Sequence, residues 1–93
     1  MANKNSYSFQ KDLLSQLKNH LESFKQEISN ATMNYKIGIQ NLHDKEGLMD
    51  ETYDEYYVNY LNPTIELMET LVARLESEDI AFVEKELDFL SSR

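Results

Sequence analysis

The 93-residue chain contains no cysteine and no tryptophan, and it has only one proline and two glycines. Without cysteine it can form neither a disulfide framework nor a thiolate zinc site, and it offers no thiol nucleophile. No apolar run approaches the roughly 18 residues that a transmembrane helix needs, and residues 1–9 lack the apolar stretch of a cleaved signal peptide. The scarcity of turn residues favours a few long helices over many short strands, in a single domain.

Acidic residues outnumber basic residues by 17 to 9, so the chain has a formal net charge of −8. Such a surface repels phosphate groups, so we expect the protein to bind neither nucleic acid nor an anionic membrane. Residues 1–43 carry five lysines and three acids, whereas residues 44–93 carry four basic residues and fourteen acids. Either these are two solvated helix faces, or the basic half packs beside the acidic half within one chain or across a dimer.

An apolar or small residue recurs at alternating steps of three and four from residue 14 to residue 42. This heptad pattern is typical of a helix that packs against another helix, and it predicts one helix over about 8–42. Lys11, Lys18 and Lys25 repeat every seven residues on another face. The predicted seam, which we expect to be an interface, consists of Leu14, Leu17, Leu21, Phe24, Ile28, Ala31, Tyr35, Gly38 and Leu42.

A turn is predicted over 43–47, because Gly47 is suited to a positive φ angle. A second helix then follows over about 48–76. We expect this helix to be kinked but continuous at Pro63; alternatively, a new helix begins there with Asn62 as its cap.

The apolar stripe of the second helix includes Leu61, Met68 and Leu75, and these residues join the predicted interface. The step of five residues from Leu75 to Ile80 leaves that stripe. We therefore predict a short third helix over about 79–91, or else one long helix with a wandering stripe. The expected fold is all-α: an antiparallel helical hairpin with a short third helix, which forms a four-helix-type bundle on dimerisation.

Four tyrosines, Tyr53, Tyr56, Tyr57 and Tyr60, fall within eight residues. On a regular helix Tyr53, Tyr57 and Tyr60 share one face, and Tyr56 points away from Tyr57. Tyrosine is enriched at interfaces, because it combines a large apolar area with a polar tip. The cluster therefore either packs under the neighbouring helix with hydrated hydroxyls or contacts another chain.

The sequence contains no pattern that indicates catalysis or metal binding. The only histidines, His20 and His43, do not stand at a helical metal-ligand spacing. The acids around Gly47 do not follow the order of a calcium-binding loop, and no serine has a general base at a readable spacing. We expect a protein that is not an enzyme and needs no cofactor or metal.

The order of these features resembles the small Trp-x-Gly helical hairpins of type VII secretion. Gly47 stands at the mid-chain turn, and an aromatic residue, Tyr53, follows six residues later. Lys45 replaces the tryptophan of the family, and Phe82 and Glu86 stand where its Tyr-x-x-x-Asp/Glu secretion signal lies. The resemblance implies a head-to-tail dimer that is exported without a cleaved signal or serves as a carrier or adaptor for a larger secreted toxin.

We therefore predict a non-catalytic protein–protein interaction module, either a homodimer or a heterodimer with another helical protein. Its further partner would be a larger toxin or a secretion component. The alternative is an intracellular acidic adaptor, effector chaperone or immunity-type inhibitor that binds a basic partner. The expected location is cytoplasmic, or outside the cell after export without a cleaved signal peptide, with no insertion into a membrane.

Overall fold

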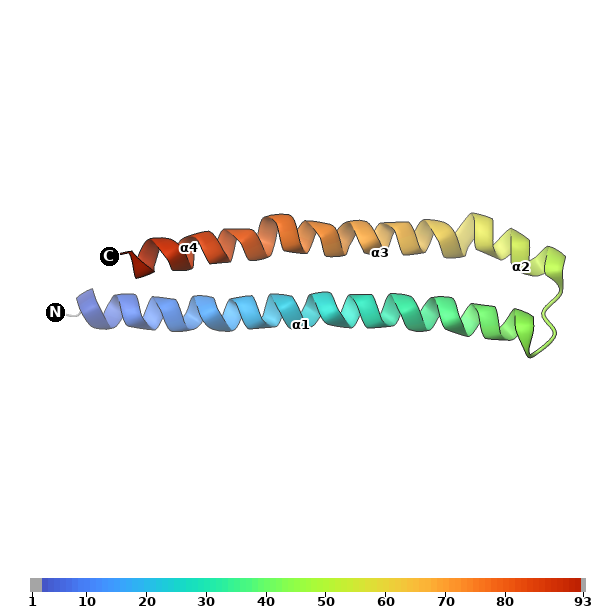
Figure 1. Ribbon diagram of the computed structural model, residues 1–93, viewed down its shortest axis with the longest axis horizontal. Coiled ribbons are helices and arrows are strands. Elements are labelled where there is room, and N and C mark those ends of the chain that lie inside the picture. The colour runs from blue at the N-terminus through green and yellow to red at the C-terminus, as the bar shows by residue number, and fades with distance from the viewer. Residues whose placement is uncertain (1–2, 93) are drawn as a thin grey trace. The chain divides into compact units, whose positions relative to one another are not determined.

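The computed structural model describes residues 3–92, with side chains from residue 6 onward. Every element in this range is a helix, so the protein is all-α, with one long helix followed by a second helical stretch (Figure 1). The α-helices are α1 (Asn3–Asp44), α2 (Asp50–Tyr56), α3 (Asn62–Arg74) and α4 (Ala81–Ser91). Two π-helical turns, η1 (Tyr57–Leu61) and η2 (Leu75–Ile80), join α2 to α3 and α3 to α4.

Compact packing divides the chain into two units. Unit 1 combines Met1–Gln26 with Ala73–Arg93, and unit 2 is Glu27–Val72. Each unit therefore joins a part of α1 to a part of the second helical stretch.

Helix α1 extends beyond the predicted range of about 8–42 at both ends, since it spans Asn3–Asp44. Its length follows from the composition of this half of the chain. No proline precedes Pro63, and Gly38 is the only glycine inside the helix. Proline and glycine are the residues that most disfavour a helix interior, so nothing in this segment ends the helix early.

The chain turns at residues 45–49, slightly later than the predicted 43–47. Gly47 has a φ of +84°, a left-handed conformation that glycine adopts without steric cost. The Leu48 amide donates a hydrogen bond of 2.9 Å to the Leu42 carbonyl. This bond satisfies one of the carbonyl groups that the end of α1 leaves without a helical partner.

The second helical stretch is continuous from Asp50 to Ser91, so residues 79–91 do not form a separate third helix. The prediction of a break came from the five-residue step between Leu75 and Ile80. Turn η2 accommodates this step, because a π turn holds more residues than an α turn. Both residues are consequently buried, at 5% exposure each.

The helix also continues through Pro63, which lies in the first turn of α3. Proline has no N–H group to donate to a preceding carbonyl. Immediately before it, the Asn62 amide donates to the Tyr57 carbonyl five residues back, the pattern of a π turn. The resulting rotation places Leu61 fully inside unit 2, at 0% exposure.

The buried core of the described residues is small. It consists of Ile28 and Leu61 in unit 2, and of Leu75, Ile80 and Val83 in unit 1. A chain of this size buries a modest fraction of its surface even when it is globular. Five buried hydrophobic side chains leave most of its apolar residues in contact with water.

Two ion pairs connect α1 to the second helical stretch within unit 1. Lys18 Nζ lies 3.0 Å from Glu84 Oε2, and Lys25 Nζ lies 2.8 Å from Glu76 Oε1. Two lysines of the basic first half of the sequence therefore pair with acids of the second half within unit 1.

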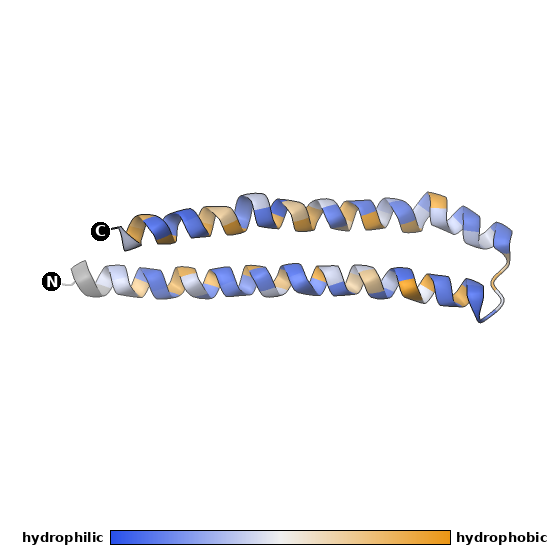
Figure 2. Cartoon of the chain, in the orientation of Figure 1, coloured by the Kyte–Doolittle hydropathy of each residue, from blue (hydrophilic) through white to orange (hydrophobic). Residues whose placement is uncertain are grey.

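Hydrophilic and hydrophobic residues are interspersed along every helix (Figure 2). Among the residues that the structure describes, no helix combines the length and the apolar character needed to span a membrane. The hydrophobic residues are instead spaced so that some lie on the inward face of each helix and others are exposed to solvent.

Candidate functional site

Only a part of the predicted seam of α1 faces the second helical stretch. The inward seam residues recur at intervals of seven: Leu14, Leu21 and Tyr35 are half-buried, and Ile28 is buried. Between them, the inward face is completed by other half-buried residues, namely Lys11, Lys18, Lys25, Thr32 and Ile39.

The three lysines lie on this inward face, so their predicted place on another face of the helix is wrong. A lysine can cover apolar surface with its aliphatic stem while its ammonium group stays at the edge. The hydrogen bond to Glu84 raises the pKa of Lys18, and the bond to Glu76 raises the pKa of Lys25. Lys25 in turn lowers the pKa of Glu76, so both groups of this pair are charged at neutral pH.

The other seam residues of α1 are exposed. In unit 1 these are Leu17 and Phe24, at 44% and 49% exposure, together with Leu13 at 43%. In unit 2 they are Ala31, Gly38 and Leu42, and Leu42 is 47% exposed. All six stand directly before an inward-facing residue, so helical geometry places them on one side of the inward face.

In the second helical stretch, too, exposed apolar residues stand in the sequence directly before inward-facing residues. Tyr60, Leu67 and Leu71 in unit 2 are 59%, 71% and 42% exposed, and Phe82 in unit 1 is 58% exposed. Each directly precedes a buried or half-buried residue: Leu61, Met68, Val72 and Val83. Tyr60 was predicted to share a face with Tyr53 and Tyr57, but the wider turn η1 rotates it outward and Leu61 inward.

In unit 1 the exposed residues of the two segments share one groove. Its volume is about 320 Å³, and it is lined by Leu17 and Leu21 from α1 and by Glu78, Asp79, Phe82 and Val83 from η2 and α4. We call Leu13, Leu17, Phe24 and Phe82 the apolar flank of unit 1.

In unit 2 the two segments run in opposite directions, because Thr32 contacts Met68 while His43 contacts Asp50. In two antiparallel helices, the residue before each inward position points to the same side of the pair, because both helices are right-handed. The exposed residues therefore form a second surface, the apolar flank of unit 2, which consists of Leu42, Tyr60, Leu67 and Leu71.

The tyrosine cluster lies in unit 2 and is mostly internal. Tyr53, Tyr56 and Tyr57 are half-buried. The Tyr35 and Tyr56 hydroxyls are 2.6 Å apart and form a hydrogen bond, which raises the pKa of Tyr56. The Tyr56 ring stacks on that of Tyr60 at a centroid distance of 5.4 Å, so Tyr60 alone of the four is mainly exposed.

His43 joins the end of α1 to the start of α2. Its Nδ1 lies 2.8 Å from Asp44 Oδ1 and its Nε2 lies 2.6 Å from Asp50 Oδ1. Its ring also stacks on Tyr53 at 4.2 Å. Carboxylates only accept hydrogen bonds, so both ring nitrogens must donate and the imidazole is protonated in this arrangement. Accordingly Asp50 and then Asp44 raise the pKa of His43.

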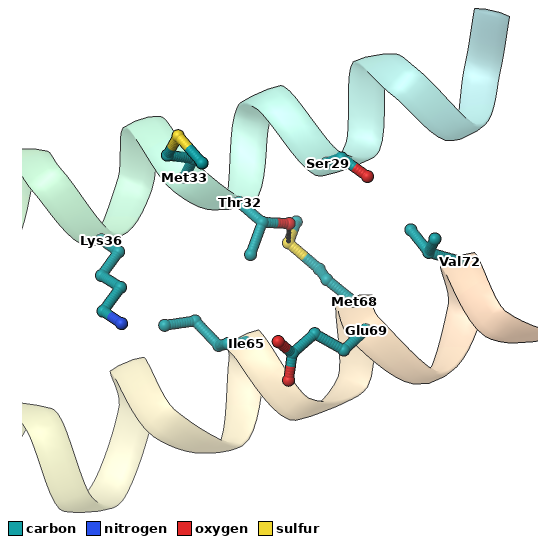
Figure 3. A pocket seen from close by; sticks show the side chains of 8 residues that line it. All are labelled: Ser29, Thr32, Met33, Lys36, Ile65, Met68, Glu69 and Val72. Atoms are coloured by element: carbon teal, nitrogen blue, oxygen red, sulfur yellow. Dashed lines mark hydrogen bonds between the residues drawn. The ribbon is translucent and has the colours of Figure 1, made fainter.

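A second groove, of about 340 Å³, lies on unit 2 (Figure 3). Its lining is mostly apolar, with Met33 from α1 and Ile65, Met68 and Val72 from α3. Met68 reaches across to α1, where the Thr32 hydroxyl donates to its Sδ at 3.0 Å. The other lining residues are Ser29, Lys36 and Glu69.

The segment that resembles a secretion signal has mixed surroundings. Phe82 is 58% exposed and Glu86 is half-buried, whereas Val83 between them is 1% exposed. Glu84 of the same segment pairs with Lys18. Of the two residues that match the signal, Phe82 is therefore the more open to another molecule.

The polar residues that line the two grooves are Glu78 and Asp79 in unit 1 and Ser29, Thr32, Lys36 and Glu69 in unit 2. Within the described residues, no group of three or more His, Asp or Glu side chains could hold a metal ion. None of the buried side-chain nitrogen or oxygen atoms that the structure describes lacks a hydrogen-bond partner. The most distinctive surface feature of both units is the row of exposed apolar side chains on each flank.

Sequence reasoning named five of these eight flank residues. It placed Leu17, Phe24 and Leu42 with inward residues in one seam, Tyr60 in the tyrosine cluster, and Phe82 in the segment that resembles a secretion signal. A signal for the separation exists in apolar doublets such as Leu13–Leu14, Leu71–Val72 and Phe82–Val83. One member of each doublet faces inward and the other outward, because consecutive helical residues are about 100° apart.

No family model matches the chain, and no curated protein or solved structure matches it either. The resemblance to the Trp-x-Gly secretion proteins therefore stays a prediction.

Proposed function

We propose that this protein is a non-catalytic interaction module, an antiparallel helical hairpin that binds a second helical chain through its apolar flanks. The observation that carries this proposal is the imbalance between buried and exposed residues. Among the described residues, fifteen large hydrophobic side chains are exposed and five hydrophobic side chains are buried. Single exposed apolar residues are common on proteins, but continuous apolar patches mark interaction sites.

The hairpin is supported by the order of contacts inside each unit. Residues later in α1 contact residues earlier in the second helical stretch. The pairs are Lys18 with Glu84, Lys25 with Glu76, Thr32 with Met68, Tyr35 with Tyr56, and His43 with Asp50.

The polar contacts support a fixed shape rather than a site of chemistry. The ion pairs, the Tyr35–Tyr56 bond and the His43 bonds all connect α1 to the second helical stretch. Surface contacts of this kind contribute little to stability, but they select one register of the two segments. A fixed register keeps the flank residues in rows that a partner helix can follow.

The proposal can be tested by site-specific photo-crosslinking in cells that produce the protein. A photoreactive phenylalanine analogue replaces Phe24 on the flank of unit 1 or, as a control, Ser15. These residues are nine positions apart in α1, which is two and a half turns, so they lie on opposite sides of the helix, and both are exposed.

We expect a protein adduct from position 24 and none from position 15. Equal adducts from both positions, or no adduct from either, would contradict binding through the flank. The mass of the adduct also tells whether the partner is a second copy of 10.9 kDa or a different chain.

A further inference from the structure

We propose that the apolar flank of unit 1 binds a basic amphipathic helix of a different protein. This inference rests on the proposed function, and it names the chemistry of the partner. It is drawn from unit 1 alone, from the order of acidic and aromatic residues beside its groove.

The two sides of the groove in unit 1 differ in charge. Helix α1 contributes the apolar residues Leu17 and Leu21 to the lining, whereas the opposite side contributes two acids, Glu78 and Asp79, beside Phe82. Exposed apolar side chains favour the binding of apolar side chains from a partner. Acids beside them select the charge that the partner carries next to its own apolar residues.

The acids continue along α4 in line with Phe82. Asp79, Phe82 and Glu86 each stand directly before a buried or half-buried residue, so helical geometry places them on one side of the segment. We call these three residues the acid–aromatic row. Its two acids are seven residues apart, which is about two helical turns or roughly 10 Å along the axis, and the aromatic ring lies between them.

The ion pairs of unit 1 leave the acids of this row without a basic partner. Those pairs use other acids, namely Glu76, Glu78 and Glu84. Among the residues that the structure describes, neither Asp79 nor Glu86 forms an ion pair. Two unpaired carboxylates beside an apolar groove attract a basic partner and repel an acidic one.

The spacing of the row specifies the pattern of the partner. A helix that runs along the groove meets both acids at once if it carries basic residues seven positions apart, because seven residues are about two turns of either helix. An apolar residue between those basic residues then contacts Phe82. Apolar contacts with complementary charges on either side are the usual arrangement of two packed helices.

A second copy of this chain does not present such a helix. Its lysines Lys11, Lys18 and Lys25 have the right spacing, but all three lie on the inward face of α1. Lys18 and Lys25 are also paired with acids of their own chain. In addition, the net charge of −8 opposes the approach of a second copy, so the partner is expected to be a different chain.

Synthetic peptides test this inference on the full chain by fluorescence anisotropy. The lysine peptide is a labelled amphipathic helix of roughly three heptads, with a leucine seam and lysines on both sides of the seam. A second peptide has glutamates in place of the lysines, and a third keeps the lysines but has alanines in place of the leucines. We expect the lysine peptide to bind at least about tenfold more tightly than either of the others, and added salt should weaken its binding.

Two double variants with the same change in charge show whether the acid–aromatic row selects the peptide. Asp79→Asn with Glu86→Gln should weaken the binding of the lysine peptide by about tenfold, because both charges beside the groove are lost. Glu22→Gln with Asp88→Asn is the matched control. Both of its residues are exposed and directly follow an inward residue, so they lie on the other side of unit 1 and binding should be unchanged. Circular dichroism shows whether each variant keeps its helices.

Three results would overturn the basic-partner inference: equal binding of the lysine and glutamate peptides, equal effects of the two double variants, or no binding of any peptide. The comparison of the peptides uses the unaltered chain, so it decides the matter even if a variant loses helicity. The proposed function then survives if position 24 still crosslinks to another chain in cells, because that adduct does not depend on the charge of the partner, and it fails if no adduct forms.

Discussion

Two valines with opposite exposure give the sharpest test of the packing. Val83 in α4 is 1% exposed, whereas Val58 in η1 is 65% exposed. Replacement by alanine removes the same two methyl groups at both positions. It also gives the same gain in helix propensity, about 0.6 kcal/mol. The difference between the two variants therefore isolates the contribution of burial.

The expected magnitude follows from the exposed fractions. At about 0.8 kcal/mol for each buried methylene-sized group, Val83→Ala loses about 1.6 kcal/mol of burial, and a cavity of roughly 50 Å³ costs about 1 kcal/mol more. After the gain in propensity, the free energy of unfolding should fall by about 2 kcal/mol. Val58→Ala loses roughly a third of the burial term, about 0.5 kcal/mol, which the propensity gain offsets.

Urea unfolding followed by circular dichroism measures both variants, at two protein concentrations because self-association raises apparent stability. A loss of about 2 kcal/mol is large against the roughly 5–14 kcal/mol expected for a chain of this length. If Val83→Ala and Val58→Ala shift the urea midpoint equally, α4 does not pack in unit 1 as described.

Three further predictions concern the two glycines, His43, and the ion pair of Lys25 with Glu76. Gly47→Ala should lower the free energy of unfolding by about 1 kcal/mol, because alanine is strained at a φ of +84°. Gly38→Ala should raise the free energy of unfolding by about 1 kcal/mol, because alanine favours a helix more than glycine does and nothing lies within 4 Å of the added Cβ. Urea unfolding measures both variants. Because the pKa of His43 is raised, its contribution to the stability of the fold is complete below pH 6.5 and is lost as the pH rises through the raised value. Thermal melts across this pH range should show the loss as a fall in melting temperature, and His43→Gln should remove the pH dependence. The lowered pKa of Glu76 gives the opposite sign, so its contribution to stability is lost as the pH falls through the lowered value. A double-mutant cycle of Glu76→Gln with Lys25→Met should find only a small coupling at neutral pH, because the Glu76 side chain is 63% exposed and water screens the pair.

The sequence predicted the long first helix and the turn at Gly47 because both depend on local signals. Helical periodicity and the conformational preference of glycine act within a few residues. The pairing of Lys18 and Lys25 with acids of the second half was also within reach, because the charge of the two halves differs so strongly.

The rotation of α1 could not be read from the same pattern. A regular seam of Leu17 and Phe24 with Leu21 satisfies the heptad rule, but the observed inward face replaces the first two with Lys18 and Lys25. A lysine counts as polar in any hydrophobic pattern, although its stem packs like an apolar side chain. The competition between these two faces is decided by the acids on the opposite segment, which are far away in the sequence.

The two π turns were not predicted either, although the sequence contains a sign of one of them. The step of five from Leu75 to Ile80 is the imprint of η2, and it was interpreted as the start of a new helix because Ser77, Glu78 and Asp79 suit a helix cap. A π turn keeps the backbone helical and leaves these residues on the surface. Packing of both apolar residues in unit 1 therefore outweighed the local capping signal.

The rotation of α1 and the two π turns together explain why the flanks exist. A helix that only packs within its own chain needs one apolar stripe, yet α1 also exposes Leu13, Leu17, Phe24 and Leu42 one residue before inward positions, with polar residues at other positions of the same row. In the second helical stretch, the extra residue of each π turn rotates Leu61 and Ile80 to the inward face. Tyr60 and Phe82 each stand one residue before an inward position, at Leu61 and Val83. Exposed apolar residues beside the inward face are the pattern expected of a helix that packs on one side within its own chain and on the adjacent side against another helix.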